Sequence, residues 1–417
     1  MGQRRLAHRQ TAQALSILES RGHWGIKKGL DNIRRLLAGL GNPEKSFPAV
    51  LIGGTNGKGS TGAFLANGLK AAGLKVGWTT SPHLLSPTER IWIDGVHCSE
   101  ADLDSILTRV LAVESAAEIK ATYFELMVAS AILAFGEASV DIALVEVGMG
   151  GRWDSTNVLS PILTILTSVA LDHTGHLGET IEAIAREKLC TARDDRPLVL
   201  GPGLDPDWVR ALCESKPEII ASPRPSAEIF WDYSIVNGYR IGMAGDHQVE
   251  NLATAMATVE CLRQMGWRLN HEATWRGFSG AAWPGRLWRA PALPHVIFDG
   301  AHNASGAEAL AIHIKRFGIR AHLFFGAMGD KDLEGMARVL ATTNPLSVTL
   351  VNVEGPRYSE PEALQDAWQM AGYVDLPILT LGELATKLRG NVADTVIVTG
   401  SLYFLGHLMR KLNIPVV

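Results

Sequence analysis

Short apolar runs bounded by glycine alternate with amphipathic segments along this chain. Parallel strands that are buried on both faces read as continuous apolar runs, and their alternation with helices is typical of a doubly wound sheet. We therefore predict an α/β fold with a parallel-sheet core. Its expected strands are 49–53, 75–79, 142–147 and 162–169, and helices are expected at 61–72 and 101–117.

A second series of strands and helices begins after an interruption by proline. The interruption includes Trp283-Pro284-Gly285-Arg286, Pro291 and Pro294. The chain has 417 residues, which is more than one hydrophobic core usually supports. We therefore predict two domains, 1–288 and 289–417. The strands expected in the second are 295–298, 321–325, 347–351 and 395–399.

The charge balance and the cysteines limit the kinds of partner. A formal net charge of −4 gives no reason to expect nucleic acid or an anionic membrane as partner. Cys98, Cys190, Cys213 and Cys261 form no C-x-x-C pair, which is typical of reduced thiols in a cytoplasmic protein. The N-terminus lacks the apolar run of a signal peptide, and the longest apolar stretches, such as 126–135, are too short to span a bilayer.

A glycine-rich loop joins the first predicted strand to its helix. A strand, such a turn and a helix N-terminus together direct N–H groups and the helix dipole at a phosphate. Lys58 would reach the terminal phosphates, and the hydroxyl of Ser60 or Thr61 would lie near Mg²⁺. The standard P-loop pattern fails, because Ile52 replaces its first glycine and Gly59 follows Lys58. A glycine-rich turn without a ligand is the alternative. The loop consists of Gly54, Thr55, Asn56, Gly57, Lys58, Gly59, Ser60 and Thr61.

Ionisable side chains occur at the ends of two predicted strands of the first domain. Glu146 ends an otherwise apolar strand, where an ionised carboxylate is costly unless it is paired or bound to a metal. The next strand ends before Asp172 and His173. Since α/β sheets bind ligands at the carboxyl ends of their strands, we predict that Glu146 and His173 are functional. A capping or packed histidine is the alternative for His173.

Three further segments have both a structural and a functional interpretation. Arg186-Glu187-Lys188 lies on a predicted helix, where the pattern alone indicates a solvated face with charge pairs. Asp299-Gly300-Ala301-His302-Asn303 follows a strand of the second domain, and Gly326 to Asp332 follows the next strand. Each of the last two segments could be a turn with a helix cap, but their common position at strand ends favours nucleotide contacts.

Together these segments resemble the folylpolyglutamate synthase and dihydrofolate synthase family of the Mur ligase superfamily. The resemblance covers nearly the whole chain in the family's order. The matching segments are GTNGKGST (54–61), SPHL (81–84), TERI (88–91), TYFE (122–125), VEVGMGGRWDSTN (145–157), DHTGHLG (172–178), REK (186–188), HQVEN (247–251), PGR (284–286), DGAHN (299–303), DKD (330–332), EGPR (354–357) and GSLYFLG (400–406).

The resemblance implies an ATP-dependent ligase with a P-loop, Mur-ligase-type ATPase domain that holds the folate site and a Rossmann-like C-terminal domain. Family members join L-glutamate to a carboxylate of dihydropteroate or of a reduced folate through an acyl phosphate, which needs Mg²⁺ and cations near the transferred phosphoryl group. The implied catalytic residues are Lys58, Glu146, His173 and Lys188. The implied metal ligands are Ser60, Ser81, Glu146 and His173, with Lys188 as a ligand if it is carbamylated. Carbamylation needs a neutral amine, which burial favours.

For the nucleotide, the resemblance implicates Asn251, Arg286, Asp299 and His302, from both predicted domains. For the acceptor it implicates Gly25, Ile26, Lys27, Lys28, Thr122, Tyr123, Phe124, Glu125, Trp153, Asp154 and Ser155. Four departures from the family's pattern stand out: Trp153 and Ser155 replace Leu and Ala, Leu189-Cys190-Thr191 replaces Ala-Gly-Ile, and Ala304 replaces proline. The first two concern the choice of acceptor more than the chemistry.

We therefore interpret the sequence as a cytoplasmic, monomeric, bifunctional dihydrofolate and folylpolyglutamate synthase that uses ATP and Mg²⁺. The alternatives are a monofunctional member of the pair, a Mur-type ligase with another carboxylate acceptor such as a peptidoglycan precursor, a P-loop phosphotransferase or nucleotide-gated binding protein, and an inactive ATP-binding paralogue. The TYFE and GMGGRWDSTN segments favour the folate branch. The intact Lys58, Glu146 and His173 argue against an inactive paralogue.

Overall fold

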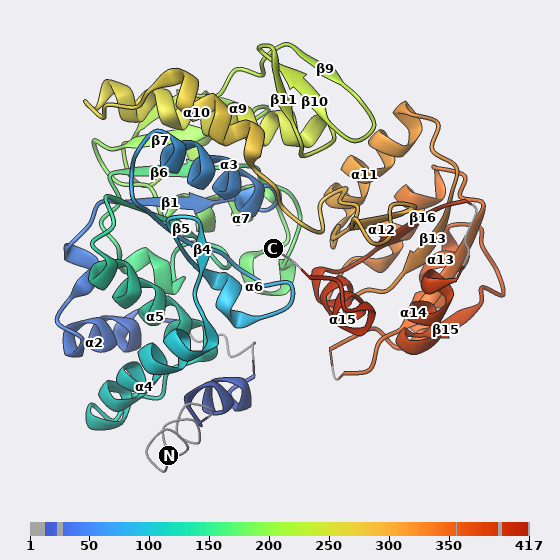
Figure 1. Cartoon of the computed structure of the whole chain (residues 1–417), viewed down its shortest axis with the longest axis horizontal. Helices are drawn as coiled ribbons and strands as arrows, with labels where there is room; N and C mark the ends of the chain where they lie inside the picture. Colours follow the sequence, from blue (N-terminus) through green and yellow to red (C-terminus); the bar gives the residue numbers. More distant parts are fainter. Residues whose placement is uncertain (1–12, 23–27, 356, 391–393, 416–417) are drawn as a thin grey trace. The chain divides into compact units, whose positions relative to one another are not determined.

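Two units, each assembled from separate stretches of the chain, make up the protein (Figure 1). The structure is a computed structural model that describes residues 13–22, 28–355, 357–390 and 394–415. The first unit contains Met1–Val169, Glu182–Pro223 and Asn251–Phe278. The second unit contains Ala170–Ile181, Arg224–Glu250 and Ser279–Val417.

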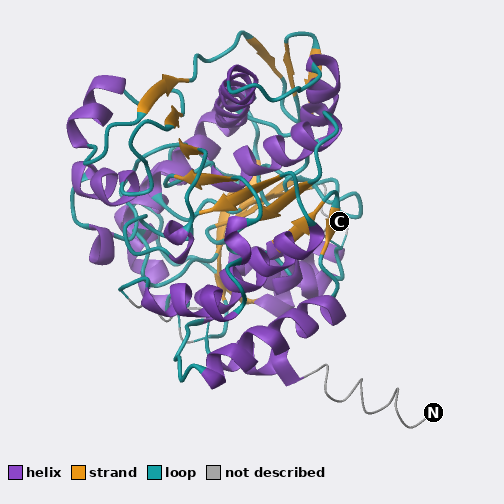
Figure 2. Ribbon diagram, turned by 90° about the vertical axis from the view of Figure 1, so that its left-hand side faces the viewer, coloured by secondary structure: helices purple, strands orange, loops and turns teal. Residues whose placement is uncertain are grey.

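The first unit is built on an eight-stranded sheet with helices packed on it (Figure 2). The order is β4 (Val96–His97), β3 (Ile91–Ile93), β2 (Val76–Thr79), β5 (Ile142–Glu146), β1 (Ala49–Gly53), β6 (Leu163–Leu166), β7 (Pro197–Leu200) and β8 (Glu218–Ala221). In this order the strands from β2 to β8 are parallel to their neighbours, whereas β3 and β4 form an antiparallel extension at one edge.

Helices bury the apolar residues of this sheet, which is why its central strands read as continuous apolar runs. On one face, α2 (Asp31–Gly39), α4 (Glu100–Ala116) and α5 (Tyr123–Ala138) form one core with the sheet, in which Leu36, Leu107 and Phe135 pack with Leu51 and Val145. The remaining helices and short 3-10 turns are α3 (Lys58–Ala71), α7 (Ile181–Leu189), α8 (Pro206–Leu212), α9 (Asp246–Gln264), α10 (His271–Gly280), η1 (Pro43–Lys45), η2 (Pro87–Arg90) and η3 (Ser155–Val158).

The second unit is built on a five-stranded, fully parallel sheet. Its order is β12 (Val296–Asp299), β16 (Thr395–Thr399), β13 (Ala321–Phe325), β14 (Ser347–Asn352) and β15 (Ile378–Thr380). One face packs against α11 (Ala304–Arg316), α12 (Leu333–Ala341) and α13 (Pro361–Met370) through residues such as Leu310, Met336 and Trp368. The helices α14 (Leu381–Arg389) and α15 (Leu402–Leu412) also contact this sheet.

The second unit also contains elements that the sequence reading did not predict. A three-stranded antiparallel sheet has the order β11 (Tyr239–Ile241), β10 (Ser234–Val236) and β9 (Ala227–Ile229). The short helix α6 (Thr174–Leu177) follows His173. The strands predicted for both parallel sheets are present, and their ends either coincide with the prediction or differ from it by one to three residues. None of the described helices is both long enough and apolar enough to cross a membrane.

Candidate active site

The glycine-rich loop lies where the sequence predicts, between β1 and the N-terminus of α3. The helix begins at Lys58, with Gly57 as the N-cap at a φ of 89°. The ammonium of Lys58 donates hydrogen bonds to the carbonyl oxygens of Gly54 and Thr55, each at 3.1 Å. Two residues beyond the end of β6, the hydroxyl of Ser168 accepts a hydrogen bond from the amide of Asn56 at 3.0 Å. The loop is therefore held open at a helix N-terminus, which is the geometry that binds phosphate.

Asn251 lies directly against this loop. A Cβ on Gly57 would lie 2.3 Å from Asn251 Oδ1, so only glycine permits this approach. Gly54 has a φ of 138°, and its Cβ would lie 2.0 Å from Thr167 Oγ1. The predicted nucleotide residue Asn251 and the predicted loop are thus brought together within the first unit.

Glu146 ends β5 beside the loop. It pairs in register with Ile52 on β1 and is 5% exposed. The hydroxyl of Thr80 donates a hydrogen bond to its Oε2 at 2.5 Å, and the amide of Ser81 donates to the same oxygen at 3.4 Å. The structure therefore brings the predicted metal ligands Ser81 and Glu146 together. Sequence reasoning missed Thr80, although it directly precedes the SPHL segment.

Lys188 lies on the buried face of α7. It is 5% exposed, and its ammonium donates a hydrogen bond to the carbonyl oxygen of Gly54 at 3.1 Å. The interpretation of this helix as a solvated charged face is therefore wrong for Lys188, although Arg186 is exposed. The spacing of the sequence could have predicted the burial of Lys188, because Ile184 lies four residues earlier on the same helix face and is fully buried.

The oxygen atoms around the loop suit a hard divalent cation. Mg²⁺ prefers carboxylate, hydroxyl and water oxygens over nitrogen and sulfur. Glu146 supplies a carboxylate, and the buried side chain of Ser60 and that of Ser81 supply hydroxyls. Among the described residues there is no cluster of three or more His, Cys, Asp or Glu side chains arranged for a metal. The donor set of the first unit is thus one carboxylate with hydroxyls, and it fits Mg²⁺ better than a soft metal.

In the second unit, Asp172 is the centre of a polar cluster. Lys331 lies 2.6 Å from its Oδ1, and Asn303 and His302 lie 3.1 and 3.4 Å from its Oδ2. Burial alone would raise the pKa of the Asp172 carboxyl, but the neighbouring His302, His173 and Lys331 outweigh it and hold that pKa well below its usual range. Three predicted segments, DHTGHLG, DGAHN and DKD, therefore meet at one carboxylate that the sequence reading did not single out.

His173 adjoins this cluster and has a left-handed backbone, with a φ of 51°. It occupies the N-cap position of α6 without a side-chain cap hydrogen bond, and its amide donates a hydrogen bond to Asp172 Oδ1 at 2.9 Å. The cap interpretation of the other two segments is correct in part, because the side chains of Asn303 and Asp332 cap α11 and α12. Helix capping thus gives Asn303 and Asp332 a structural role. The side chains of His173 and His302 are partly exposed.

Asp299, Arg286 and His247 form the other predicted group of the second unit. Asp299 ends β12 and accepts hydrogen bonds from the amides of Leu287 and Ala301 at 2.9 and 3.0 Å. Arg286 lies against the following turn, since a Cβ on Gly300 would lie 2.4 Å from its Nη1. Burial lowers the pKa of His247 to about 4, and Asp299 counteracts this only in part.

The segments predicted for the acceptor are only partly described. Gly25, Ile26 and Lys27 lie outside the described residues, and Lys28 is exposed. Thr122 and Glu125 form a capping box at the start of α5. The ring of Phe124 lies against the backbone of Gly148, whose Cβ would approach Phe124 Cζ within 2.5 Å. Two predicted segments, 122–125 and 145–157, are thus in contact.

Two of the residues that depart from the family pattern, Trp153 and Ser155, lie on either side of Asp154. Trp153 is 48% exposed, whereas Asp154 and Ser155 are each 7% exposed. The carboxylate of Asp154 accepts hydrogen bonds from the amide of Met149 at 2.9 Å and the hydroxyl of Thr156 at 2.6 Å. Burial raises the pKa of Asp154, and these hydrogen bonds oppose it. Asp154 therefore fixes the shape of this loop, and Trp153 is the side chain it presents to solvent.

Two polar side chains near the N-terminus hold the connection that precedes α5. Arg21 donates two hydrogen bonds to Glu114, at 2.6 and 2.8 Å, and a third to the carbonyl oxygen of Ala121 at 2.8 Å. Asn32 donates to the carbonyl oxygen of Lys120 at 2.9 Å. Sequence reasoning missed this contact, which holds the start of the TYFE segment in place.

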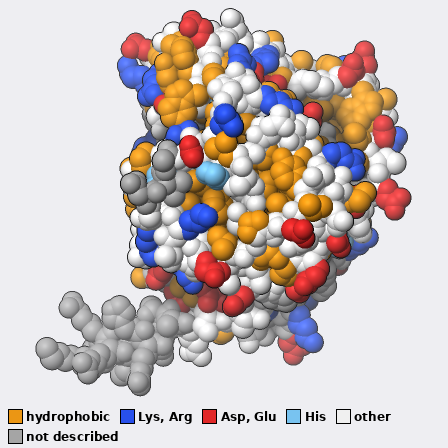
Figure 3. All heavy atoms as spheres, turned by 90° about the vertical axis from the view of Figure 1, so that its right-hand side faces the viewer, with side chains coloured by type: hydrophobic (Ala, Val, Ile, Leu, Met, Phe, Trp, Pro, Cys, Tyr) orange, Lys and Arg blue, Asp and Glu red, His pale blue; other side chains and the backbone are white. Residues whose placement is uncertain are grey.

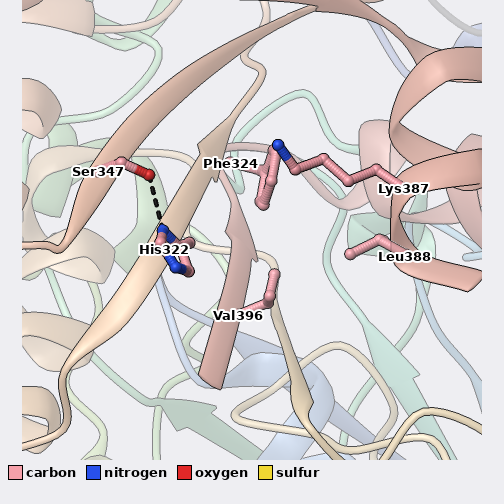
Figure 4. A pocket seen from close by; sticks show the side chains of 6 residues that line it. All are labelled: His322, Phe324, Ser347, Lys387, Leu388 and Val396. Atoms are coloured by element: carbon pink, nitrogen blue, oxygen red, sulfur yellow. Dashed lines mark hydrogen bonds between the residues drawn. The ribbon is translucent and has the colours of Figure 1, made fainter. Parts of the chain in front are cut away.

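A small pocket of about 180 Å³ lies elsewhere in the second unit (Figure 4). Its lining includes His322 and Ser347, which are hydrogen-bonded at 2.8 Å, and Val396. In the parallel register, Val396 pairs with the first residue of β12, whereas Asp299 is its last. The pocket is therefore at the amino ends of the strands, roughly 10 Å from the edge that carries Asp299. Since α/β sheets bind ligands at the opposite edge, we do not assign it to the site.

The loop at the N-terminus of α3 has the geometry that can bind phosphate, and comparison with known proteins identifies the class of protein. Residues 285–402 match the family of Mur ligase glutamate ligase domains. The class is therefore that of the Mur-type ligases.

The whole chain is similar to proteins of one branch of that class. It is 34% identical to a dihydrofolate synthase/folylpolyglutamate synthase of Bacillus subtilis, over 96% of this chain and 98% of the relative. It is 33% identical to a probable dihydrofolate synthetase of Schizosaccharomyces pombe, over 94% of this chain and all of the relative. The chain belongs to the dihydrofolate synthase/folylpolyglutamate synthase family.

Solved structures agree with this family. A folylpolyglutamate synthase of Mycobacterium tuberculosis, complexed with ADP, superposes with a TM-score of 0.86 at 29% identity and covers 98% of this chain and 99% of its own. FolC of E. coli, in complex with DHPP and ADP, superposes with a TM-score of 0.83 at 29% identity and covers 97% of both chains. The predicted fold class and the predicted family are both confirmed.

Proposed function

We propose that this chain joins L-glutamate to dihydropteroate and to tetrahydrofolates that carry one or more glutamates, using ATP. One observation carries this proposal: β1 leads into a helix N-terminal loop that contains Lys58, and the neighbouring strand β5 ends in a buried carboxylate, Glu146. Two relatives, from Bacillus subtilis and Escherichia coli, are named for both synthase activities. The E. coli neighbour binds DHPP and ADP, and another neighbour has Mn, AMPPNP and L-glutamate bound.

The reaction requires two group transfers in sequence. An oxygen of the acceptor carboxylate attacks the γ-phosphorus of ATP, ADP leaves, and an acyl phosphate forms. The amine of glutamate then attacks the acyl carbon, and a tetrahedral intermediate collapses to the amide with loss of phosphate and of one amine proton. Lys58 and the first-turn amides of α3 would offset charge on the phosphoryl group. A bound Mg²⁺ would neutralise further phosphate charge.

Each predicted site residue keeps its role as part of this proposal. The nucleotide would be held by Gly54 to Thr61 and by Asn251, Arg286, Asp299 and His302. The metal ligands would be Ser60, Ser81, Glu146 and His173, with Lys188 as a further ligand after carbamylation. The burial of Lys188 supports that modification, because burial favours the neutral amine that reacts with CO₂. The acceptor would contact 25–28, 122–125 and 153–155.

We also propose that the protein is a cytoplasmic monomer, with no nucleic acid or membrane as partner, and that its domain boundary lies near residue 288. The formal net charge of −4 supports the exclusion of nucleic acid and of an anionic membrane as partners. On the face of the second unit drawn in Figure 3, acidic and basic side chains are intermixed among apolar ones. The start of the glutamate ligase match at residue 285 supports the boundary.

The decisive experiment measures phosphate release from ATP with glutamate and each acceptor in turn. We expect release with dihydropteroate and with tetrahydrofolate, and none when glutamate is omitted. Release with one acceptor only would assign a monofunctional enzyme. No release with either would reject the folate proposal.

A further inference from the structure

Arg90, the last residue of the TERI segment, is a buried cation without an anionic partner. It ends η2, immediately before β3, and is 5% exposed. Throughout the described residues, no carboxylate oxygen lies within 4.0 Å of its guanidinium. An arginine side chain is always charged, and a buried charge is costly unless it is paired and hydrogen-bonded. The side chain therefore requires an explanation.

The neighbours of Arg90 satisfy only part of its guanidinium. Its Nε donates one hydrogen bond to Nδ1 of His83 at 3.0 Å, and its Cζ lies 5.2 Å from the ring centre of Tyr123. A guanidinium has five N–H donors in a planar fork. The two Nη groups, which form the edge that binds a carboxylate with two parallel hydrogen bonds, remain available.

The carboxylate nearest in sequence is committed elsewhere. Glu89 accepts hydrogen bonds at 2.7 Å from the amides of Leu84, Leu85 and Ser86. Glu89 therefore holds the turn that leads into η2, whereas the Arg90 side chain contacts His83 and Tyr123. The sequence thus supplies a carboxylate beside the arginine but uses it to shape a loop.

Arg90 connects two segments to which the proposed function gives a role. Tyr123 belongs to the segment 122–125, proposed for the acceptor. His83 follows two residues after Ser81, whose amide donates to the proposed metal ligand Glu146. A ligand bound by the Nη groups would therefore lie between the segment that holds the acceptor and the residues that serve its reacting end.

We propose that Arg90 binds the carboxylate of the acceptor that does not react, the α-carboxylate of the terminal glutamate of a reduced folate. This inference rests on the proposed function. A folate acceptor carries two carboxylates on its terminal glutamate, and only the γ-carboxylate is phosphorylated. Dihydropteroate carries a single carboxylate, which reacts, so it offers no second anion. Arg90 would therefore serve folylpolyglutamate synthesis and not dihydrofolate synthesis.

The test compares Arg90→Met and Arg90→Lys with the wild-type enzyme on both acceptors. For Arg90→Met we expect KM for tetrahydrofolate to rise on the order of 10- to 100-fold, as when one partner of a buried charge pair is removed. Its kcat with tetrahydrofolate should change by less than about 3-fold, and KM for dihydropteroate should stay within about 2-fold of the wild-type value. Arg90→Lys keeps the charge but loses the planar fork of donors, so its KM for tetrahydrofolate should lie between those of the wild-type enzyme and Arg90→Met. Arg109→Met, which removes a surface ion pair with Glu137, is the control and should change neither KM.

A modified acceptor isolates the proposed contact. In an analogue with 4-aminobutyrate in place of glutamate, the reacting carboxylate is retained and the α-carboxylate is absent. The wild-type enzyme should bind this analogue as weakly as Arg90→Met binds tetrahydrofolate, and Arg90→Met should not distinguish the two acceptors. If Arg90→Met does not fold, the wild-type enzyme and Arg90→Lys still carry this comparison.

The outcomes separate the inference from the proposed function. An equal rise of KM for both acceptors, an unchanged KM for tetrahydrofolate in Arg90→Met, or equal wild-type KM values for tetrahydrofolate and its analogue would each overturn the role of Arg90. Wild-type activity with dihydropteroate alone would also overturn it. A wild-type enzyme inactive with both acceptors would instead reject the function on which the inference depends.

Discussion

Replacing Gly57 with alanine tests whether Asn251 serves the nucleotide, because this glycine is subject to two separable constraints. Its φ of 89° lies in the left-handed region, where an L side chain costs roughly 1–2 kcal/mol. Its Cβ would also lie 2.3 Å from Asn251 Oδ1. Since that atom is the end of a side chain, the amide can rotate away, so the contact adds little to the loss of stability but displaces Asn251.

Gly73, which follows the other end of α3, is a matched control. It has a φ of 100°, and a Cβ there would meet nothing within 4 Å. Urea denaturation should show that Gly57→Ala and Gly73→Ala each lose roughly 1–2 kcal/mol of unfolding free energy. In an ADP-release assay with saturating acceptor and glutamate, only Gly57→Ala should raise KM for ATP, by about 5- to 10-fold, the loss of one hydrogen bond. Equal KM values for ATP in the two variants would refute the proposed role of Asn251.

Three further predictions concern charged groups. Lys58→Ala should lower kcat for ADP release at least about 100-fold and shift the unfolding free energy by less than about 1 kcal/mol. Lys70→Ala is the control, and near-normal turnover of Lys58→Ala would contradict the interpretation of the loop as a phosphate-binding loop. Lys331→Met should cost about 3–5 kcal/mol in urea denaturation, because it removes the ammonium 2.6 Å from the buried Asp172 carboxylate and leaves Asn303 and His302 beside it. Adding Asp172→Asn should recover most of that loss, and a cost below about 1 kcal/mol would place the pair among surface ion pairs. Burial lowers the pKa of His247 to about 4 from an ordinary 6.5, so the unfolded chain binds more protons between these values. Stability should therefore be full above about pH 6.5 and fall as the pH is lowered toward 4. His247→Gln should reduce this fall by about 3 kcal/mol, and an unchanged pH profile would show that His247 is not the cause.

The parallel sheets could be predicted because their strands are buried on both faces. Ala49–Gly53 and Ile142–Glu146 are buried at every position, so each reads as an apolar run, which in the second strand is ended by Glu146. The sheet of β9, β10 and β11 gave no such signal, because each strand has three residues and mixed burial. Its residues look like a polar connection in a sequence window.

The candidate site was predictable where its residues are adjacent in sequence, as in the loop from Gly54 to Thr61. It was not predictable where distant residues meet. Asp172 contacts Asn303 and Lys331, which are 131 and 159 residues away, and no local pattern connects them. Arg90 shows the same limit, since the TERI segment was recognised from the sequence but only the structure shows that its arginine is buried without an anion.

The contact between Arg21 and Glu114 has a consequence for the order in which the chain can fold during synthesis. The two residues are 93 positions apart. At a ribosomal rate of about 5–20 residues per second, Arg21 is made roughly 5–20 s before its partner. During that interval α2 can form only local contacts, because the helices α4 and α5 that complete its core have not yet been made. We therefore expect Arg21 and α2 to reach their native packing late, although they are synthesised early.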